Sequence, residues 1–290
     1  MFERAGRATI RGFLQWPDLF VFGLLAFGLT LILDTLVAPI WNGLISGDTS
    51  PVIGALIIFA QQFVLTFASF VIAVAAARIA LARMVGRQMS IVEGLSLTPL
   101  LRPIATYTAI YTAITSAMII GYLVLMYGAT GLSFASLTTT SGLTGLTQAP
   151  TMNLNPSVAC LTLLVFVPAF IAWMLANLLV APVIAAEQTG GTAAIRRSWH
   201  LVRHSVQVVV GLLAVGLLAG CSVSLLISIF VVTPEMLTSV QLGAEIPVLP
   251  ELPPLLSAVL SALLFMVGAI FGAAWYLVAA EAAAPASLNG

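Results

Sequence analysis

The chain contains no lysine and little charge of either sign. Charged residues make up 7% of its 290 residues, whereas hydrophobic residues make up 61%. A soluble domain carries roughly 25% charged residues, so this chain could not cover a water-facing surface. We therefore expect an integral membrane protein whose length is used up by membrane spans.

Cysteine and histidine are equally scarce. The two cysteines, Cys160 and Cys221, fall at different predicted depths in the membrane, and a disulfide needs Cα atoms within about 7 Å. We interpret both as small apolar residues. The two histidines, His200 and His204, lie four residues apart, but Arg203 stands beside them and no glutamate separates them. The sequence therefore predicts no metal site and no cofactor.

Six apolar segments are long enough to cross a bilayer, which takes about 20 residues of helix. They predict an all-α polytopic bundle that forms a single membrane domain over residues 1–290. The predicted spans cover about 17–40, 52–82, 104–127, 158–186, 206–232 and 255–280.

All ten basic residues are arginines, and they fall on alternate connections between these spans. They are Arg4, Arg7, Arg11, Arg78, Arg83, Arg87, Arg102, Arg196, Arg197 and Arg203. Connections rich in arginine stay in the cytoplasm, so we expect a bacterial inner-membrane protein with both termini inside. The predicted partners are the lipid bilayer and its anionic headgroups at the cytoplasmic face, with no nucleic acid.

Two short polar stretches, at about 90–102 and 192–204, predict interfacial helices at this face. Ser90 and Glu93 have the spacing of a capping box, and Pro103 is expected to end or interrupt the first of these helices. Thr192 is the expected cap of the second helix, which is amphipathic.

Glycines four residues apart occur in each of the last two predicted spans, at Gly216 and Gly220 and at Gly268 and Gly272. Such small residues let membrane helices approach closely. The pattern predicts tight packing within one subunit or, alternatively, a dimer interface.

Several polar residues lie within the first four predicted spans. They are Asp34, Gln61, Thr108, Tyr111, Thr112, Thr115 and Asn177. Polar groups inside a membrane are costly and often functional. They predict either a polar cavity or a set of hydrogen bonds that hold the helices together.

The sequence offers no pattern for catalysis. It has neither the G-x-S-x-G of a nucleophile elbow nor a glycine-rich phosphate loop. Nucleophilic catalysis needs a serine or cysteine beside a base, and both histidines stand among arginines. We therefore predict no catalytic residues.

Residues 181–203 carry a more specific pattern: a proline near the end of a span, a glutamate, a glycine-containing turn, and a helix with the letters R-R-S-W. The residues in this pattern are Pro182, Glu187, Gly191, Ala194, Arg196, Arg197, Ser198, Trp199 and Arg203. On these residues the chain resembles the membrane domain associated with bacterial glycerophosphoryl diester phosphodiesterases, and its six-span relatives of unknown function.

In fused members of that family a soluble phosphodiesterase barrel follows the membrane domain. Only a short tail follows Glu281 here, so we do not expect the hydrolytic activity. Glu187 is expected to pair with Arg196, Arg197 or Arg203 and to hold the second interfacial helix against the fourth span.

Together these patterns favour a non-enzymatic membrane protein. It would serve as a scaffold, an accessory subunit, or a modulator of envelope lipid or membrane-complex assembly, with another membrane protein or a second copy as its partner. The alternative is a transporter of small solutes or lipids that uses the polar cavity.

Overall fold

The computed structural model describes residues 2–32, 35, 39, 51–130, 156–205, 208 and 254–283. These residues form helices and no strands. The elements are α1 (Phe2–Gln15), η1 (Pro17–Leu19), α2 (Phe20–Ile32), α4 (Pro51–Met84), α5 (Ile91–Leu95), η3 (Thr98–Leu100), α6 (Leu101–Thr130), α8 (Pro156–Asn177), α9 (Val180–Glu187), α10 (Gly191–His204) and α13 (Pro254–Ala283).

Four helical stretches in the described residues are long and apolar enough to cross a membrane. They are Phe59–Met84, Ile91–Tyr122, Leu164–Glu187 and Ala258–Ala283. A fifth candidate is the pair Glu3–Gln15 and Pro17–Ile32, which is bent by 86°. The described chain thus has the all-helical architecture and the long apolar helices of a membrane protein.

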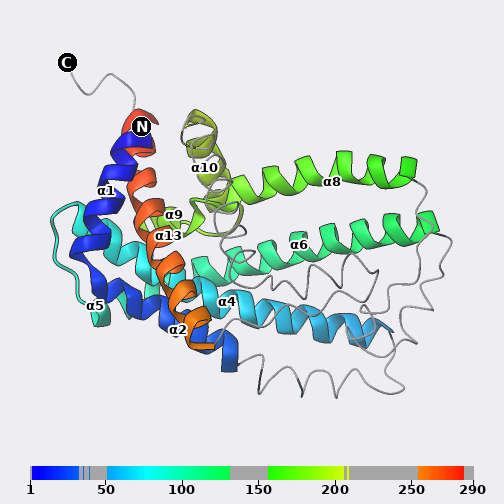
Figure 1. Ribbon diagram of the computed structural model, residues 1–290, viewed down its shortest axis with the longest axis horizontal. Helices are drawn as coiled ribbons and strands as arrows, with labels where there is room; N and C mark the ends of the chain where they lie inside the picture. The colour runs from blue at the N-terminus through cyan, green and yellow to red at the C-terminus, as the bar shows by residue number, and fades with distance from the viewer. Residues whose placement is uncertain are drawn as a thin grey trace, which may run out of the picture.

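The helices pack in two groups that meet at one end of the molecule. In one group α4, α6 and α8 lie side by side, and in the other α13 packs against α1 and α2 (Figure 1). The groups join where α13 and α9 contact α4. At 34 residues, α4 is about 51 Å long, which exceeds the roughly 30 Å of a hydrocarbon core.

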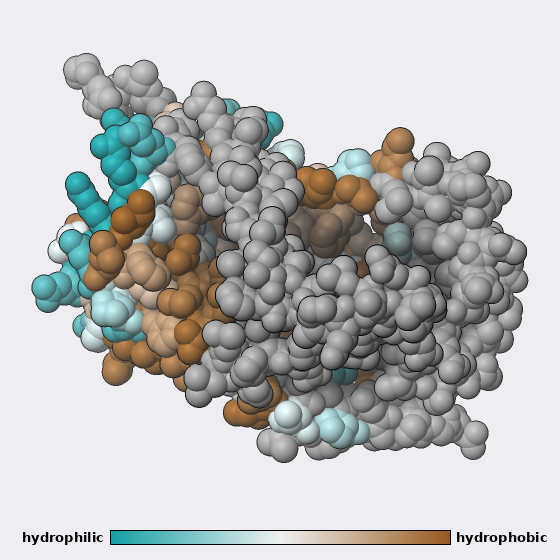
Figure 2. Space-filling view, viewed as in Figure 1, coloured by the Kyte–Doolittle hydropathy of each residue, from teal (hydrophilic) through white to brown (hydrophobic). Residues whose placement is uncertain are grey.

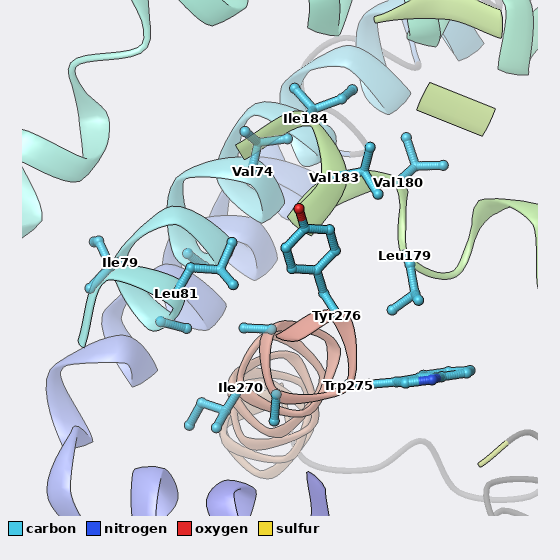
Figure 3. Close-up of a cluster of buried hydrophobic side chains, with 14 of the residues drawn as sticks. Val74, Ile79, Leu81, Leu179, Val180, Val183, Ile184, Ile270, Trp275 and Tyr276 are labelled. Atoms are coloured by element: carbon cyan, nitrogen blue, oxygen red, sulfur yellow. The ribbon is translucent and has the colours of Figure 1, made fainter. Parts of the chain in front are cut away.

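The buried core lies at this junction rather than along the whole bundle. The last turns of α4 contribute Val74 and Ile79, and α9 contributes Val183 and Ile184, all fully buried. In Figure 3 these side chains lie on one side of α13, from which Tyr276 points toward α9. In the first half of α4 none of the described side chains is buried and most are apolar, as expected for a surface that lipid covers.

The first predicted span begins differently from the expectation. An additional helix, α1, precedes it and buries Ala5 and Gly12 on one side, and the chain then turns at Trp16 and Pro17. Pro17 stands at the start of η1, where its missing N–H costs nothing. The described part of the predicted span is η1 and α2, which ends at Ile32, and Asp34 lies outside the described residues.

The capping box at Ser90 and Glu93 is confirmed, because both of its hydrogen bonds are present. The helix that it starts, however, ends at Leu95 rather than near residue 102. Arg78 of α4 donates to the carbonyl of Ser96 at 2.7 Å, which holds the end of α5 against α4. Pro103 belongs to the first turn of α6, where proline is tolerated, so it neither ends nor interrupts α5.

The fourth predicted span is divided. α8 ends at Asn177 and α9 begins at Val180, so Pro182 falls in the first turn of α9. A proline ring clashes with the carbonyl four residues earlier, which for Pro182 is that of Leu178. This clash explains why the helix breaks at Leu178. Pro168, by contrast, lies inside α8.

The remaining predicted segments have mixed outcomes. Thr192 does not cap α10: the N-cap residue is Gly190, without a side-chain hydrogen bond. The last predicted span corresponds to α13. The fifth predicted span and the three predicted outer connections lie almost wholly outside the described residues.

Candidate functional site

Glu187 joins three helices at the junction of the two groups. Its Oε1 atom accepts one hydrogen bond from Nε of Arg197 on α10, at 2.9 Å, and another from the hydroxyl of Tyr276 on α13, at 3.0 Å. The side chains of Glu187 and Arg197 are 26% and 38% exposed, so the ion pair is only partly desolvated. Of the three arginines considered as partners of Glu187, Arg197 is the one that pairs.

The turn between α9 and α10 brings these residues together. Gln188 adopts the left-handed conformation, with φ of 56°, and its N–H donates to the carbonyl of Ile184. At Gly190, a Cβ atom would lie 2.4 Å from the Cα atom of Pro103, so only glycine lets the turn approach the start of α6. Gly191 follows with φ of 60°. The glycine pair therefore determines how α10 folds back onto the bundle.

Two buried serines, one within α10 and one directly after it, accept hydrogen bonds from N–H groups of neighbouring helices. The hydroxyl of Ser198 accepts from the backbone N–H of Leu179, at 3.1 Å, at the break between α8 and α9. The hydroxyl of Ser205 accepts from Nε1 of Trp275, at 2.8 Å, and donates to the carbonyl of Leu201. Ser198 belongs to the R-R-S-W pattern, but its capping of a broken neighbouring helix was not predicted.

Three further residues of that pattern, Arg196, Trp199 and Arg203, face outward. Arg196 and Arg203 are exposed, and Trp199 is 39% exposed. No hydrogen bond or ion pair of either arginine side chain is found within the described residues. The R-R-S-W helix thus presents an inner face that binds α8, α9 and α13, and an outer face that is basic and aromatic.

Five of the seven polar residues predicted for a cavity lie on α6 and α8, and three of these five make hydrogen bonds. Thr115 accepts from Nε1 of Trp173 at 3.1 Å. Asn177 accepts from the hydroxyl of Tyr107 at 3.0 Å and donates to the carbonyl of Trp173 at 2.6 Å. Tyr111 lies between the rings of Tyr107 and Trp173, with both centroid distances 5.8 Å.

Thr108 and Thr112 are buried on the same helix but differ in their bonding. Thr108 donates to the carbonyl of Ile104, one turn back, at 2.9 Å. The hydroxyl of Thr112 is buried and has no hydrogen-bond partner in the described part of the chain. Gln61 is half-buried on α4 and is not among the residues that connect α6 to α8. Asp34 lies outside the described residues.

Sequence reasoning missed an ion pair between Asp18 and Arg83. The guanidinium of Arg83 donates to both carboxylate oxygens, at 2.7 and 2.5 Å, and also to the carbonyl of Met89, at 3.2 Å. The pair ties the start of α2 to the end of α4 beside an open polar cleft of about 650 Å³. An acidic residue two positions after Trp16, at the start of the first predicted span, was the signal that could have identified it.

The rings of His200 and His204 on α10 are tilted by 35° to each other, with centroids 4.3 Å apart. Nδ1 of His200 is buried and has no hydrogen-bond partner among the residues described. Burial of the ring lowers the pKa of His200 below its ordinary value of 6.5, and the charges of His204, Arg203 and Arg197 lower it further. His200 is therefore neutral at pH 7.

No group of three or more histidine, cysteine or acidic side chains in the described ranges could hold a metal ion. Comparison of the chain with protein-family models, with curated proteins and with solved structures finds no match. The resemblance to the phosphodiesterase-associated membrane domain therefore stays a prediction. What the geometry offers chemically is a set of structural ion pairs and an outward-facing basic surface on α10.

Proposed function

We propose that this chain is a non-enzymatic, six-span protein of the bacterial inner membrane that acts as a scaffold or accessory subunit. The single observation that carries the proposal is the pairing of polar side chains between α6 and α8. Tyr107 is bonded to Asn177, and Trp173 to Thr115. A transport pathway would need such groups free for a solute, whereas these groups hold two helices together.

The distribution of charge supports a cytoplasmic docking face. The elements that carry the arginines, namely α1, the end of α4, the start of α6, and α10, lie toward one end of the α4–α6–α8 group (Figure 1). Figure 2 shows hydrophilic side chains gathered over α1 and brown, apolar side chains beneath them. Basic residues stay on the cytoplasmic side, so both termini are assigned to the cytoplasm.

Site-specific photo-crosslinking in cells tests the scaffold role. A photoreactive residue replaces Arg7 or Gln88, both exposed at the proposed docking face. The matched control replaces Leu164, which is 73% exposed on the apolar side of α8. We expect one discrete protein adduct from the first two positions and only lipid adducts from the control. The same adduct pattern at all three positions would contradict the proposal.

Two further measurements address membrane orientation and the presence of hydrolytic or transport activity. A cysteine placed at Gln15, in a chain whose own cysteines are replaced, should react with an impermeant reagent only in inverted vesicles, whereas one at Thr138 should react in intact cells. Purified protein in liposomes should neither hydrolyse phospholipid nor carry solutes. Hydrolysis that disappears in Glu187→Gln would show the protein to be an enzyme.

One observation favours transport as the second candidate. Thr112 is only 3% exposed, and its hydroxyl lacks a partner in the described residues. Such a group is available to a solute that passes between helices. Transport that is lost in Thr112→Val and kept in Thr108→Val would favour this function over the scaffold.

A further inference from the structure

An apolar groove of about 420 Å³ opens between α6, α8 and α10. It is lined by Met118, Ala169, Ala172, Trp173, Ala176 and Trp199. All six side chains are apolar apart from the two indole N–H groups, and that of Trp173 already donates to Thr115. The groove therefore offers contact to hydrocarbon and almost nothing to a polar ligand.

The shape of the groove follows from the sequence of α8. Ala169, Ala172 and Ala176 lie at i, i+3 and i+7, so their methyl groups follow one another along one face of the helix. Phe170 and Met174 stand exposed on the same helix and are 48% and 54% exposed. The three methyl groups thus leave an open apolar surface along this face of α8.

The rim of the groove on α10 is basic. Arg196, Trp199 and Arg203 lie at i, i+3 and i+7, so the two guanidinium groups flank the indole that lines the groove. Both arginines are exposed and have no ion pair within the described residues, whereas Arg197 on the inner face is paired with Glu187. The rim thus carries two uncompensated positive charges beside an apolar channel.

We propose that this groove, together with Arg196 and Arg203, binds one phospholipid with an anionic headgroup. One acyl chain lies along the alanines of α8, the indole of Trp199 lies at the level of the glycerol, and the two arginines contact the phosphate. Arginine recognises phosphate with several N–H donors at once, and tryptophan favours the region between headgroups and chains. The proposal rests on the membrane placement given under the proposed function.

Lipid titration followed by native mass spectrometry of the full chain in mild detergent tests this assignment. The probes are dioleoyl phosphatidylglycerol, which is anionic, and dioleoyl phosphatidylcholine, which has the same chains without net charge. We expect phosphatidylglycerol to bind at least tenfold more tightly to the unaltered protein. An arginine near the lipid surface contributes about fivefold in affinity. The double variant Arg196→Gln, Arg203→Gln should therefore lose most of this preference.

The matched charge control is Arg4→Gln with Arg11→Gln. Both arginines are exposed on α1, far along the chain from the groove. Their substitution removes the same amount of positive charge as the Arg196 and Arg203 double variant. This control should keep the preference for phosphatidylglycerol, and an equal loss in both double variants would overturn the proposal. Equal affinity of the unaltered protein for the two lipids would overturn it as well.

A second set of measurements tests the acyl channel. Ala172→Leu fills the groove and should weaken binding of both lipids, whereas Val64→Leu, at an exposed apolar position on α4, should not. If Ala172→Leu fails to fold, excess soluble glycerol phosphate replaces it as the test. Displacement of the lipid by glycerol phosphate would show an anion site without a chain channel and refute the proposal. None of these outcomes depends on whether the protein crosslinks a partner or shows turnover.

Discussion

Gly23 on α2 is a position where one added methyl group would meet the backbone of a neighbouring helix. A Cβ atom there would lie 2.5 Å from both the Cα atom and the carbonyl oxygen of Ala262 on α13. These are backbone atoms of a straight helix, so no side chain can rotate away. Ordinary contacts of a Cβ atom begin at 3.4 Å, so α2 and α13 would have to separate by about 1 Å locally.

The expected cost of Gly23→Ala follows from two opposing effects. Overpacking costs about 1–3 kcal/mol, whereas replacing glycine by alanine within a helix contributes about 0.5–1 kcal/mol of stability. We therefore expect the free energy of unfolding to fall by about 1–2 kcal/mol. Reversible unfolding in mixed dodecyl maltoside and dodecyl sulfate micelles, followed by tryptophan fluorescence, measures this change.

Gly28→Ala is the matched control, because Gly28 lies on the same helix and an added Cβ atom would meet nothing within 4 Å. This variant should be as stable as the unaltered protein or more stable by up to about 1 kcal/mol. Equal stability of Gly23→Ala and Gly28→Ala would show that α2 and α13 do not approach as closely as described.

Three further changes test individual interactions. Ser198→Ala leaves the buried N–H of Leu179 without its acceptor and should lower the free energy of unfolding by about 1–3 kcal/mol; an unchanged unfolding midpoint would contradict this role. Thr112→Val removes a hydroxyl that has no described partner, so the same assay should show stability unchanged or raised by about 1 kcal/mol, and a clear loss would reveal a partner. The pKa of His200 is lowered in the folded state, so below about pH 6.5 the unfolded chain binds a proton that the folded chain does not, and stability falls. His200→Gln should reduce the loss of thermal stability between pH 7 and pH 5. An equal loss in the unaltered protein and in His200→Gln would contradict this role of His200.

The candidate sites show where sequence reasoning stopped. The position of Glu187 near several arginines was evident, but the choice of Arg197 depends on the turn through Gln188 and Gly190. Tyr276 could not be predicted as the third member, because it lies 89 residues away along the chain. Likewise Asp18 and Arg83 are 65 residues apart and meet only because α2 and α4 pack together.

The glycine patterns illustrate the same limit. The spacing of four predicted close approach at Gly268 and Gly272. Among the described residues, however, a Cβ atom at Gly268 would meet nothing within 4 Å, and one at Gly272 would only reach Pro182 at 3.9 Å. The close approach occurs at Gly23, which has no such partner glycine. Periodicity identifies a small face on one helix, but which neighbour covers that face depends on the rest of the bundle.

The sequence by itself determined the class of protein, the positions of most long helices and the capping box at Ser90. These properties depend on local quantities: apolar length, proline and glycine positions, and hydrogen bonds between near neighbours. Only the tertiary structure decided which arginine Glu187 binds, that Ser198 caps the break before α9, and that Trp199 lines a groove on α8. Each of these contacts joins helices distant in sequence, and their relative placement is set by packing of the whole bundle.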